Sequence, residues 1–267
     1  MKILIISHYF YPENFKINDI ALGLKSKGHE LTILTGKPNY PKGRFYDRYS
    51  FFNMNFEEWK GIGIYRCFVI PRGNGSSFKL FLNYISFALS SLIRILFIRK
   101  KFDKIFVYQP SPITVGIPAV FSKFIFKAPV YFWVQDLWPQ SLSAAGGINN
   151  SLLLNLVDQV TRGIYSFCDR IFVQSKAFIP YLLNQKVSLE KINYLPNTTE
   201  TFYKPLKSKK FSNLISNDKN YLKLIFAGNL GKAQSLETMI HSTDILSKKK
   251  IKIKWYILGD GRYKSDL

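Results

Sequence analysis

Short apolar runs alternate with stretches of helical periodicity along most of this 267-residue chain. The run "KILIIS" at residues 2–7 is followed by apolar residues at helical spacing from Ile17 to Leu24, and Gly28 ends that spacing before the run "ELTILT". A strand, a helix and a second strand in this order are typical of a βαβ unit. The pattern therefore predicts a parallel sheet covered by helices.

The alternation continues toward the carboxyl terminus. It predicts further strands at "GIYRCFVIP", "KIFVYQ", "PVYFWVQ", "RIFVQS" and "KINYLP". The polar, Lys- and Ser-rich stretch 197–220 is typical of a linker, and "YLKLIFAGNL", a helical segment and "IKIKWYILGDG" follow as one more βαβ unit. We predict an α/β protein with a complete first domain over 1–196, a linker over 197–220 and an incomplete second domain over 221–267, because two parallel strands cannot bury both faces.

The longest apolar stretch, residues 78–102, approaches the length of a membrane span but contains Lys79, Asn83 and Arg94. We therefore do not interpret it as a spanning helix. Two interpretations stay open, an ordinary buried helix and a helix lying in a membrane interface. The second would place the cations that end the stretch against anionic lipid: Arg99, Lys100 and Lys101.

The formal charge is +21, from 38 Lys and Arg against 17 Asp and Glu. This excess favours a polyanionic partner, although a Lys-rich composition alone also explains it. The aromatic residues lie mostly in apolar runs and not among arginines, which argues against nucleic acid. Cys67 and Cys168 stand alone, so neither a disulfide framework nor a zinc site is indicated. The first apolar run ends at His8 without a cleavage site, which predicts a strand and a cytoplasmic protein.

Two common enzyme classes are not indicated. The first strand-to-helix turn, "SHYFYPENFKIND", lacks the glycine pattern of nicotinamide and flavin enzymes, and no G-x-S-x-G motif marks a hydrolase. His8 follows the first strand, at the edge where open α/β sheets bind ligands, and is therefore a candidate site residue.

Five segments, in this order and spacing, resemble the family 4 group of retaining glycosyltransferases with two Rossmann-like domains, the GT-B fold: "KGHELTILTG", "CDRIFVQSKAFIPYLL", "INYLPNTTETFYKP", "FAGNLGKAQSLETMI" and "ILGDGRYKSDL". Three more look like the bacterial branch that builds O-antigen or capsule, including enzymes similar to L-fucosamine transferases: "YFYPENFKINDIALGL", "GKPNYPKGRFYDRY" and "VYFWVQDLWPQSL".

The resemblance implies transfer of a sugar, with retention at the anomeric carbon, from a nucleotide-sugar that we expect to be UDP-linked. It implies no metal and no other cofactor. The acceptor would be a saccharide on polyprenyl diphosphate, held by the first domain, and the second domain would hold the donor. The expected location is peripheral, on an anionic membrane surface at the cytoplasmic face of the bacterial plasma membrane.

Donor phosphates need cations and backbone N–H groups at a helix N-terminus. The turn before the last predicted helix offers Gly228, Gly231 and Lys232. An ordinary Gly-rich turn with a solvated lysine is the alternative. The chain departs from the family's usual Arg and Lys in this turn, with Asn229 and Gln234 in those places.

On the first domain, the resemblance directs attention to the loop before the first helix and to the turn "QDLWP". Lys16 would be the cation of that loop, facing phosphate, with His8, Asn14 and Asn18 on the acceptor side. Asp136 matches an acidic site residue, and we predict that it positions or deprotonates the acceptor hydroxyl. Capping of the turn before Pro139 is the alternative.

The family's Glu-x7-Glu donor site would lie beyond Leu267. The expectation is therefore a chain shortened relative to the family, which would need a separate chain carrying the rest of the donor domain. Two other functions stay open, an inactive fragment and a non-catalytic basic module that binds a membrane surface.

Overall fold

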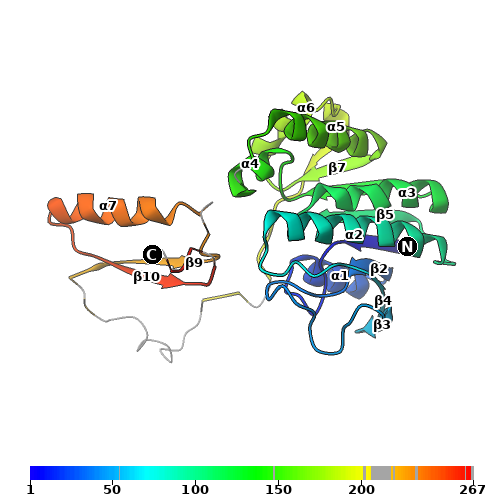
Figure 1. The fold of residues 1–267 in the computed structure, drawn as a ribbon, viewed down its shortest axis with the longest axis horizontal. Coiled ribbons are helices and arrows are strands. Elements are labelled where there is room, and N and C mark those ends of the chain that lie inside the picture. Colours follow the sequence, from blue (N-terminus) through cyan, green and yellow to red (C-terminus); the bar gives the residue numbers. More distant parts are fainter. Residues whose placement is uncertain are drawn as a thin grey trace. The chain divides into compact units, whose positions relative to one another are not determined.

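The computed structural model describes residues 1–53, 55–146, 148–200, 203–205, 218, 220–231, 234–261 and 263–265. The chain divides into two compact units, Met1–Thr198 and Thr199–Leu267, and each has its own sheet (Figure 1). The first unit ends two residues beyond the domain boundary that the sequence predicts. Most of the predicted linker lies outside the described residues.

The first unit is built on one eight-stranded sheet with the order β3-β4-β2-β1-β5-β6-β7-β8. All neighbouring strands are parallel except β3, which runs antiparallel to β4. The predicted α/β class with a parallel sheet is confirmed. The strands are β1 (Lys2–Ser7), β2 (Glu30–Gly36), β3 (Phe56–Trp59), β4 (Ile62–Cys67), β5 (Lys104–Gln109), β6 (Val130–Val134), β7 (Arg170–Val173) and β8 (Ile192–Tyr194).

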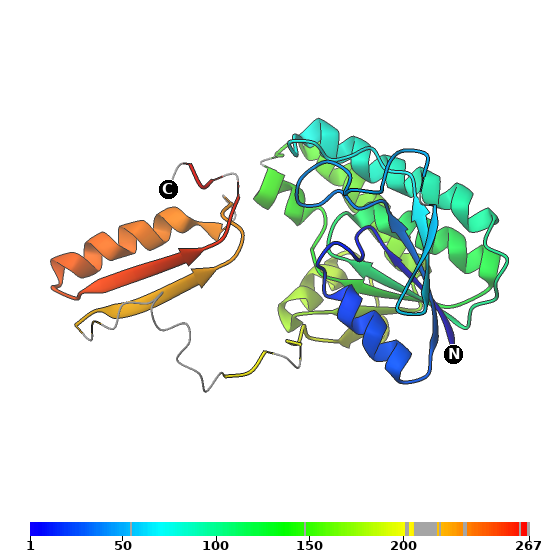
Figure 2. The same ribbon diagram turned by 90° about the horizontal axis from the view of Figure 1, so that it is seen from below.

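Helices cover both faces of this sheet (Figures 1 and 2). Alternate residues of β1 enter two separate cores, because successive side chains of a strand point to opposite faces. Leu4 and Ile6 pack with α2, α3 and α5, whereas Ile3 and Ile5 pack with α1. The helical segments are α1 (Ile17–Ser26), α2 (Ser77–Leu96), η1 (Ile113–Val115), α3 (Gly116–Phe126), α4 (Gln140–Gly146), α5 (Ser151–Phe167), η2 (Lys176–Phe178), α6 (Ile179–Asn184) and η3 (Leu189–Lys191).

Helix α2 is long and apolar enough to cross a membrane by length and composition alone, a test that core helices of soluble proteins also pass. Its buried side is anchored in the first unit by polar contacts. Asn83 donates to the Ile70 carbonyl at 2.6 Å, and the Ser90 hydroxyl donates to the Phe68 carbonyl at 2.6 Å. The helix is therefore an integral part of the sheet's covering layer.

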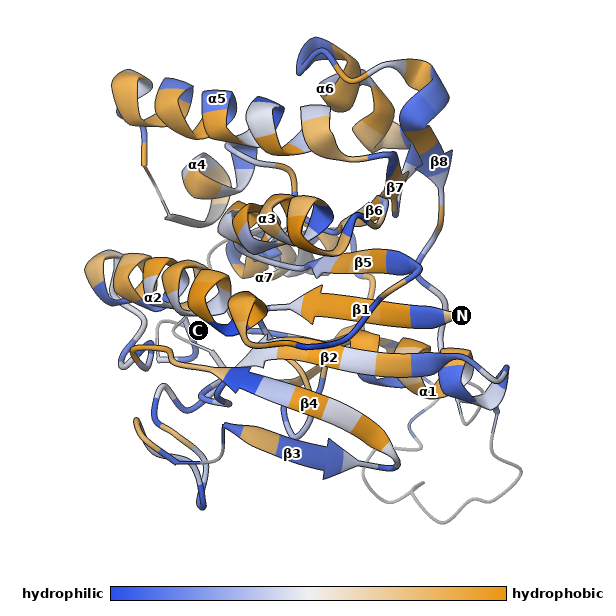
Figure 3. Cartoon of the chain, turned by 90° about the vertical axis from the view of Figure 1, so that its right-hand side faces the viewer, coloured by the Kyte–Doolittle hydropathy of each residue, from blue (hydrophilic) through white to orange (hydrophobic). Residues whose placement is uncertain are grey.

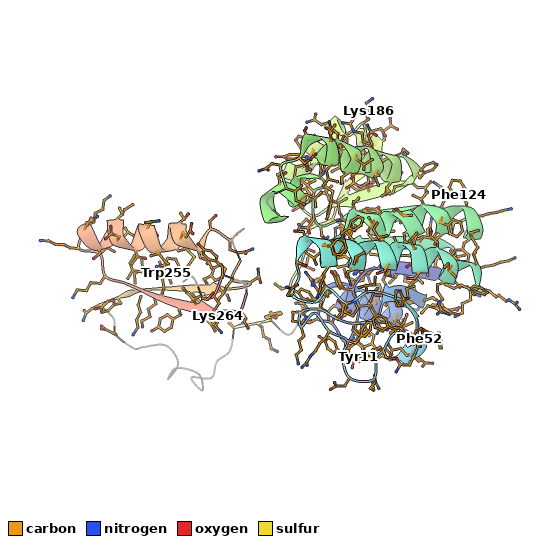
Figure 4. All side chains as sticks on the ribbon, in the orientation of Figure 1. Tyr11, Phe52, Phe124, Lys186, Trp255 and Lys264 are labelled. Atoms are coloured by element: carbon orange, nitrogen blue, oxygen red, sulfur yellow. The ribbon has the colours of Figure 1, made fainter. Side chains whose placement is uncertain are left out.

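The second unit is a two-stranded parallel sheet of β9 (Leu222–Ala227) and β10 (Ile253–Leu258) with helix α7 (Leu236–Lys248). Trp255 lies between strand and helix, and its Nε1 donates to Thr243 Oγ1 at 2.7 Å (Figure 4). Several large apolar side chains of the two strands are exposed: Leu222, Ile225, Ile257 and Leu258.

Candidate functional site

The strand order of the first unit reverses between β1 and β5, since β2 lies on one side of β1 and β5 on the other. In open α/β sheets, ligands bind at the carboxyl edge beside such a switch point. Residues that follow β1, β5 and β6 share this edge. They are the candidate site of the first unit.

Asp136 lies at this edge, two residues after β6 ends at Val134. Its side chain is half-buried, and this desolvation raises the pKa of the carboxyl group to about 6. Within the described part of the chain, no hydrogen bond to the Asp136 carboxylate is found. A half-buried carboxylate that accepts no such hydrogen bond and whose pKa lies near neutral pH has the properties of a general base.

The backbone of Asp136 is held by Gln109, the last residue of β5. In the orientation that satisfies both ends of the Gln109 amide, its nitrogen donates to the Asp136 carbonyl at 3.2 Å. Its oxygen accepts from Trp138 Nε1 at 3.3 Å. The position of the carboxylate therefore depends on the neighbouring strand and not only on its own turn.

A cluster of carboxamides continues the site across β6, β7 and β8. Asn197 Nδ2 donates to Gln135 Oε1 at 2.7 Å and to Gln174 Oε1 at 2.6 Å, and Gln174 Nε2 donates to the Gln135 carbonyl at 2.7 Å. Gln135 Nε2 is buried and has no hydrogen-bond partner among the residues that the structure describes. We call Gln109, Gln135, Gln174 and Asn197 the amide ladder.

The sequence prediction did not include the amide ladder, although a signal is present. Three predicted strands end on glutamine, in "FVYQ", "FWVQ" and "IFVQ". Because parallel strands bring their carboxyl ends to one edge, these glutamines must lie side by side. Carboxamides offer donors and acceptors together, which suits hydroxyl-rich ligands.

His8 lies at the predicted edge but is almost fully buried. Its Nε2 is 2.9 Å from Asn83 Oδ1, and its ring packs edge-on against Tyr9 and Phe87. Burial lowers its pKa to about 3, so the ring is neutral at physiological pH. In this structure His8 links β1 to α2 beneath the surface of the site.

The loop before α1 is held by Asn18, which accepts from the Tyr11 backbone N–H at 3.0 Å and donates to the Glu13 carbonyl at 2.8 Å. Asn14 is exposed at the tip of this loop, and Lys16 is half-buried at the N-terminal end of α1. Of the predicted acceptor-side residues, Asn14 is therefore the one open to solvent.

Glu13 joins this loop to the segment after β2. Its side chain is buried, and Oε1 accepts from the backbone N–H groups of Asn39 and Tyr40 at 2.8 and 2.7 Å. Desolvation raises its pKa to about 7, although these hydrogen bonds oppose the shift. The fold therefore favours protonated Glu13.

Because the pKa of Glu13 is raised on folding, its contribution to stability is complete below about pH 4.5 and is lost as the pH rises through about 7. A Glu13→Gln variant keeps the acceptor oxygen and cannot ionise. We expect its melting temperature to rise relative to the parent between pH 5 and pH 8. Thermal melts of both proteins at several pH values measure this difference in melting temperature. Buried His8 has the opposite pH dependence, but it is present in both proteins and therefore drops out of the difference.

Exposed Glu190→Gln serves as the control for the Glu13 experiment, and its difference from the parent should stay constant with pH. A constant difference for Glu13→Gln as well would show that the Glu13 carboxyl is not destabilised by burial.

In the second unit, two glycine turns pack backbone against backbone. A Cβ atom on Gly259 would lie 1.9 Å from the Gly228 carbonyl oxygen, and one on Gly261 would lie 2.1 Å from that of Leu230. Leu230 N–H also donates to the Asp260 carbonyl at 2.9 Å. Gly259 and Gly261 therefore must be glycine for the "GDG" turn to pack against the backbone of Gly228 and Leu230.

Asn229 and Gln234 stand where the resemblance expected cations, and their amides are 3.4 Å apart across Gly231. The predicted phosphate turn thus brings Gly228, Asn229 and Gly231 together before α7. Lys232 lies outside the described residues.

No group of three or more His, Cys, Asp or Glu side chains that could hold a metal ion is found in the described parts of the chain. Two shallow hollows of about 500 and 440 Å³ lie at the opposite, amino edge of the sheet, beside Met1 and Glu30 and beside Lys123 and Asp169. Neither includes a predicted site residue.

Comparison with known proteins supports the fold. No protein-family model matches the sequence. A protein assigned as the colanic acid biosynthesis glycosyl transferase WcaI of Escherichia coli (strain K12) is 23% identical over 286 aligned residues, which cover 100% of this chain and 68% of that protein.

Among solved structures, sucrose-phosphate synthase from Thermosynechococcus elongatus matches with a TM-score of 0.68 at 12% identity, over 96% of this chain and 61% of that chain. HepE of Anabaena, in complex with UDP, matches with a TM-score of 0.59 at 12% identity, over 100% and 63%. The chain spans about three fifths of the length of these two structures. Its fold is that of the GT-B glycosyltransferases, as the sequence predicts.

Proposed function

We propose that this chain belongs to a glycosyltransferase that moves a sugar from a nucleotide-sugar to a hydroxyl group of a saccharide acceptor. The observation that carries the proposal is Asp136, an unpaired carboxylate whose pKa burial raises to about 6 at the switch-point edge of a GT-B sheet. Beside it, the amide ladder supplies neutral hydrogen-bonding groups of the kind that bind sugar hydroxyls.

For the donor, we propose a UDP-sugar whose phosphates bind Gly228, Asn229, Gly231 and Lys232 of the second unit, with Lys16 of the first unit as a further phosphate-binding residue. Two observations support this choice. Solved structures with the same fold contain UDP or a UDP-sugar analogue. The turn also precedes α7, whose first backbone N–H groups attract phosphate oxygens.

For the acceptor, we propose a saccharide on polyprenyl diphosphate in the assembly of a bacterial surface polysaccharide, O-antigen or capsule, at the cytoplasmic face of the plasma membrane. The likeness to WcaI and the formal charge of +21 support this assignment. Asp136 would accept the proton of the acceptor hydroxyl, with Asn14 and the amide ladder orienting the saccharide. We propose that transfer retains the anomeric configuration and needs no metal.

A transfer assay tests the proposal. The purified chain is incubated with a panel of UDP-sugars and with saccharides on short-chain prenyl diphosphate, with EDTA and without it. We expect the acceptor mass to increase by one sugar residue, with the anomeric configuration of the donor, either for the chain alone or after addition of a chain that supplies the rest of a donor domain. A chain that shows no UDP-dependent NMR shifts and no product in either format would contradict the proposal.

A further inference from the structure

The outward side of helix α2 is apolar, which is unusual for a surface helix. Large apolar side chains are exposed in its first turns and through its last two turns, where charged residues normally stand. Only Lys79 and Arg94 are charged within α2. The exposed apolar residues of α2 and its C-terminal cap are Phe78, Phe81, Leu89, Ile93, Leu96 and Phe97.

The apolar surface continues over the next two helices of the same layer. Helix α3 packs between α2 and α5 and is apolar along most of its length (Figure 3). Phe124 and Ile125 are exposed near its end, where Figure 4 shows Phe124 at the surface. Helix α5 adds Leu152, Leu153, Leu156, Val160 and Phe167. We call the exposed apolar residues of these three helices the apolar face.

Exposed apolar side chains gathered on three neighbouring helices mark an interaction surface, because soluble monomers rarely expose large apolar areas. The charge around it indicates the partner. Residues 77–127 contain eight Lys and Arg residues and one acidic residue, Asp103. The Asp103 carboxylate accepts a hydrogen bond from the Lys2 backbone N–H at 2.7 Å. The cations gather where α2 and α3 end: Arg99, Lys100, Lys101 and Lys127. Lys123, in the last turns of α3, is paired with Asp169 at 2.8 Å.

Apolar side chains surrounded by cations are complementary to an anionic lipid bilayer, which combines a hydrocarbon interior with negative headgroups. A second copy of the chain would bring the same excess of positive charge and would be repelled. A spanning arrangement of α2 would break the hydrogen bonds that Asn83 and Ser90 make inside the first unit. Lying on the bilayer keeps them.

We propose that the apolar face of α2, α3 and α5 inserts shallowly into an anionic bilayer, with the basic ends of α2 and α3 on the headgroups. The inference deepens the proposed function and rests on it for its biological meaning, since a lipid-linked acceptor lies in a bilayer. Asn83 connects α2 directly to His8 beneath the candidate site. The face therefore belongs to the same unit as the site that would receive the acceptor.

Vesicle co-sedimentation of the whole chain tests the proposal, without donor or acceptor. We expect binding to phosphatidylcholine vesicles that contain phosphatidylglycerol, and much weaker binding to phosphatidylcholine alone at physiological ionic strength. Replacing Arg99, Lys100 and Lys101 by Gln should weaken binding about fivefold for each cation removed. Ile93→Asp should weaken it at least tenfold, because a charge replaces an inserted side chain.

Leu189→Asp is the matched control, since Leu189 and Ile93 are equally exposed, at 62%, and Leu189 lies on η3, outside the face. Its vesicle binding should stay within twofold of the parent. A second readout uses an environment-sensitive dye on I93C or L189C, because the native Cys67 and Cys168 are buried. The dye should shift to the blue on anionic vesicles at position 93 and not at 189.

Equal binding of the parent to both vesicle types, unchanged binding of Ile93→Asp, or a dimer that Ile93→Asp dissociates without vesicle binding would each overturn the proposal. Vesicle binding without sugar transfer would support the membrane-binding face and contradict the proposed transferase function. Transfer to a soluble acceptor without vesicle binding would support the transferase function and contradict the membrane-binding face.

Discussion

An Asp136→Asn variant is expected to lose between about a hundredfold and ten thousandfold in kcat for sugar transfer, with little change in KM. The amide keeps the shape of the side chain but cannot accept the acceptor's proton. Because the pKa of Asp136 is about 6, the parent's rate should rise as the pH increases through 6, and the variant's residual rate should not. Initial rates between pH 5 and pH 8 measure both effects.

Misfolding does not explain such a loss, because burial disfavours the charged form of Asp136. Above pH 6, a neutral amide should leave the free energy of unfolding unchanged or raise it. Asp244→Asn, at an exposed ion pair with Lys248, is the control and should keep full activity. A rate for Asp136→Asn within threefold of the parent would show that Asp136 only caps its turn.

An Arg66→Met variant is expected to lose about 3 to 5 kcal/mol in free energy of unfolding. Arg66 is fully buried, and its Nε donates to Glu57 Oε1 at 2.6 Å. It also donates to the carbonyls of Gly36 and Tyr11. Methionine fills similar space but removes the buried cation from the Glu57 carboxylate, which keeps the Tyr49 hydroxyl, and leaves both carbonyls without their donor. Urea unfolding followed by tryptophan fluorescence gives the difference.

Arg48→Met provides a matched control, because Arg48 approaches the same Glu57 carboxylate at 3.9 Å but is 68% exposed. An exposed pair of this kind contributes less than about 1 kcal/mol. The contrast between the two variants isolates the effect of burial. A cost of less than 1 kcal/mol for Arg66→Met would mean that water or another side chain replaces the guanidinium.

The parallel strands could be predicted from the sequence because each is a compact apolar run followed by a helical pattern. β3 was not predicted, since Glu57 and Glu58 interrupt its apolar pattern and the strand has only four residues. Its turn does carry a signal. Lys60 and Gly61 both have positive φ, at 50° and 71°, which is the geometry of a two-residue hairpin turn.

Predictions at the candidate site were limited by distance along the chain. Strand topology predicted that Asp136 and His8 lie at the carboxyl edge, because every parallel strand ends there, and the family resemblance singled out Asp136 as a site residue. The burial of His8 depends on Asn83, which lies 75 residues away. Likewise, the partners of Glu13 are the backbone of Asn39 and Tyr40 and not a side-chain motif. Local patterns contain no information about such contacts.

Because the amide ladder does not titrate, the affinity for the acceptor and the rate of transfer should depend differently on pH. None of its four side chains gains or loses a proton between pH 4 and pH 9, whereas Asp136 beside it does. Acceptor affinity and turnover would therefore be controlled by separate groups on adjacent strands. For the transfer proposed here, a fall in pH below about 6 would lower the rate while acceptor binding by the amide ladder stayed unchanged, and the rate would recover with the pH.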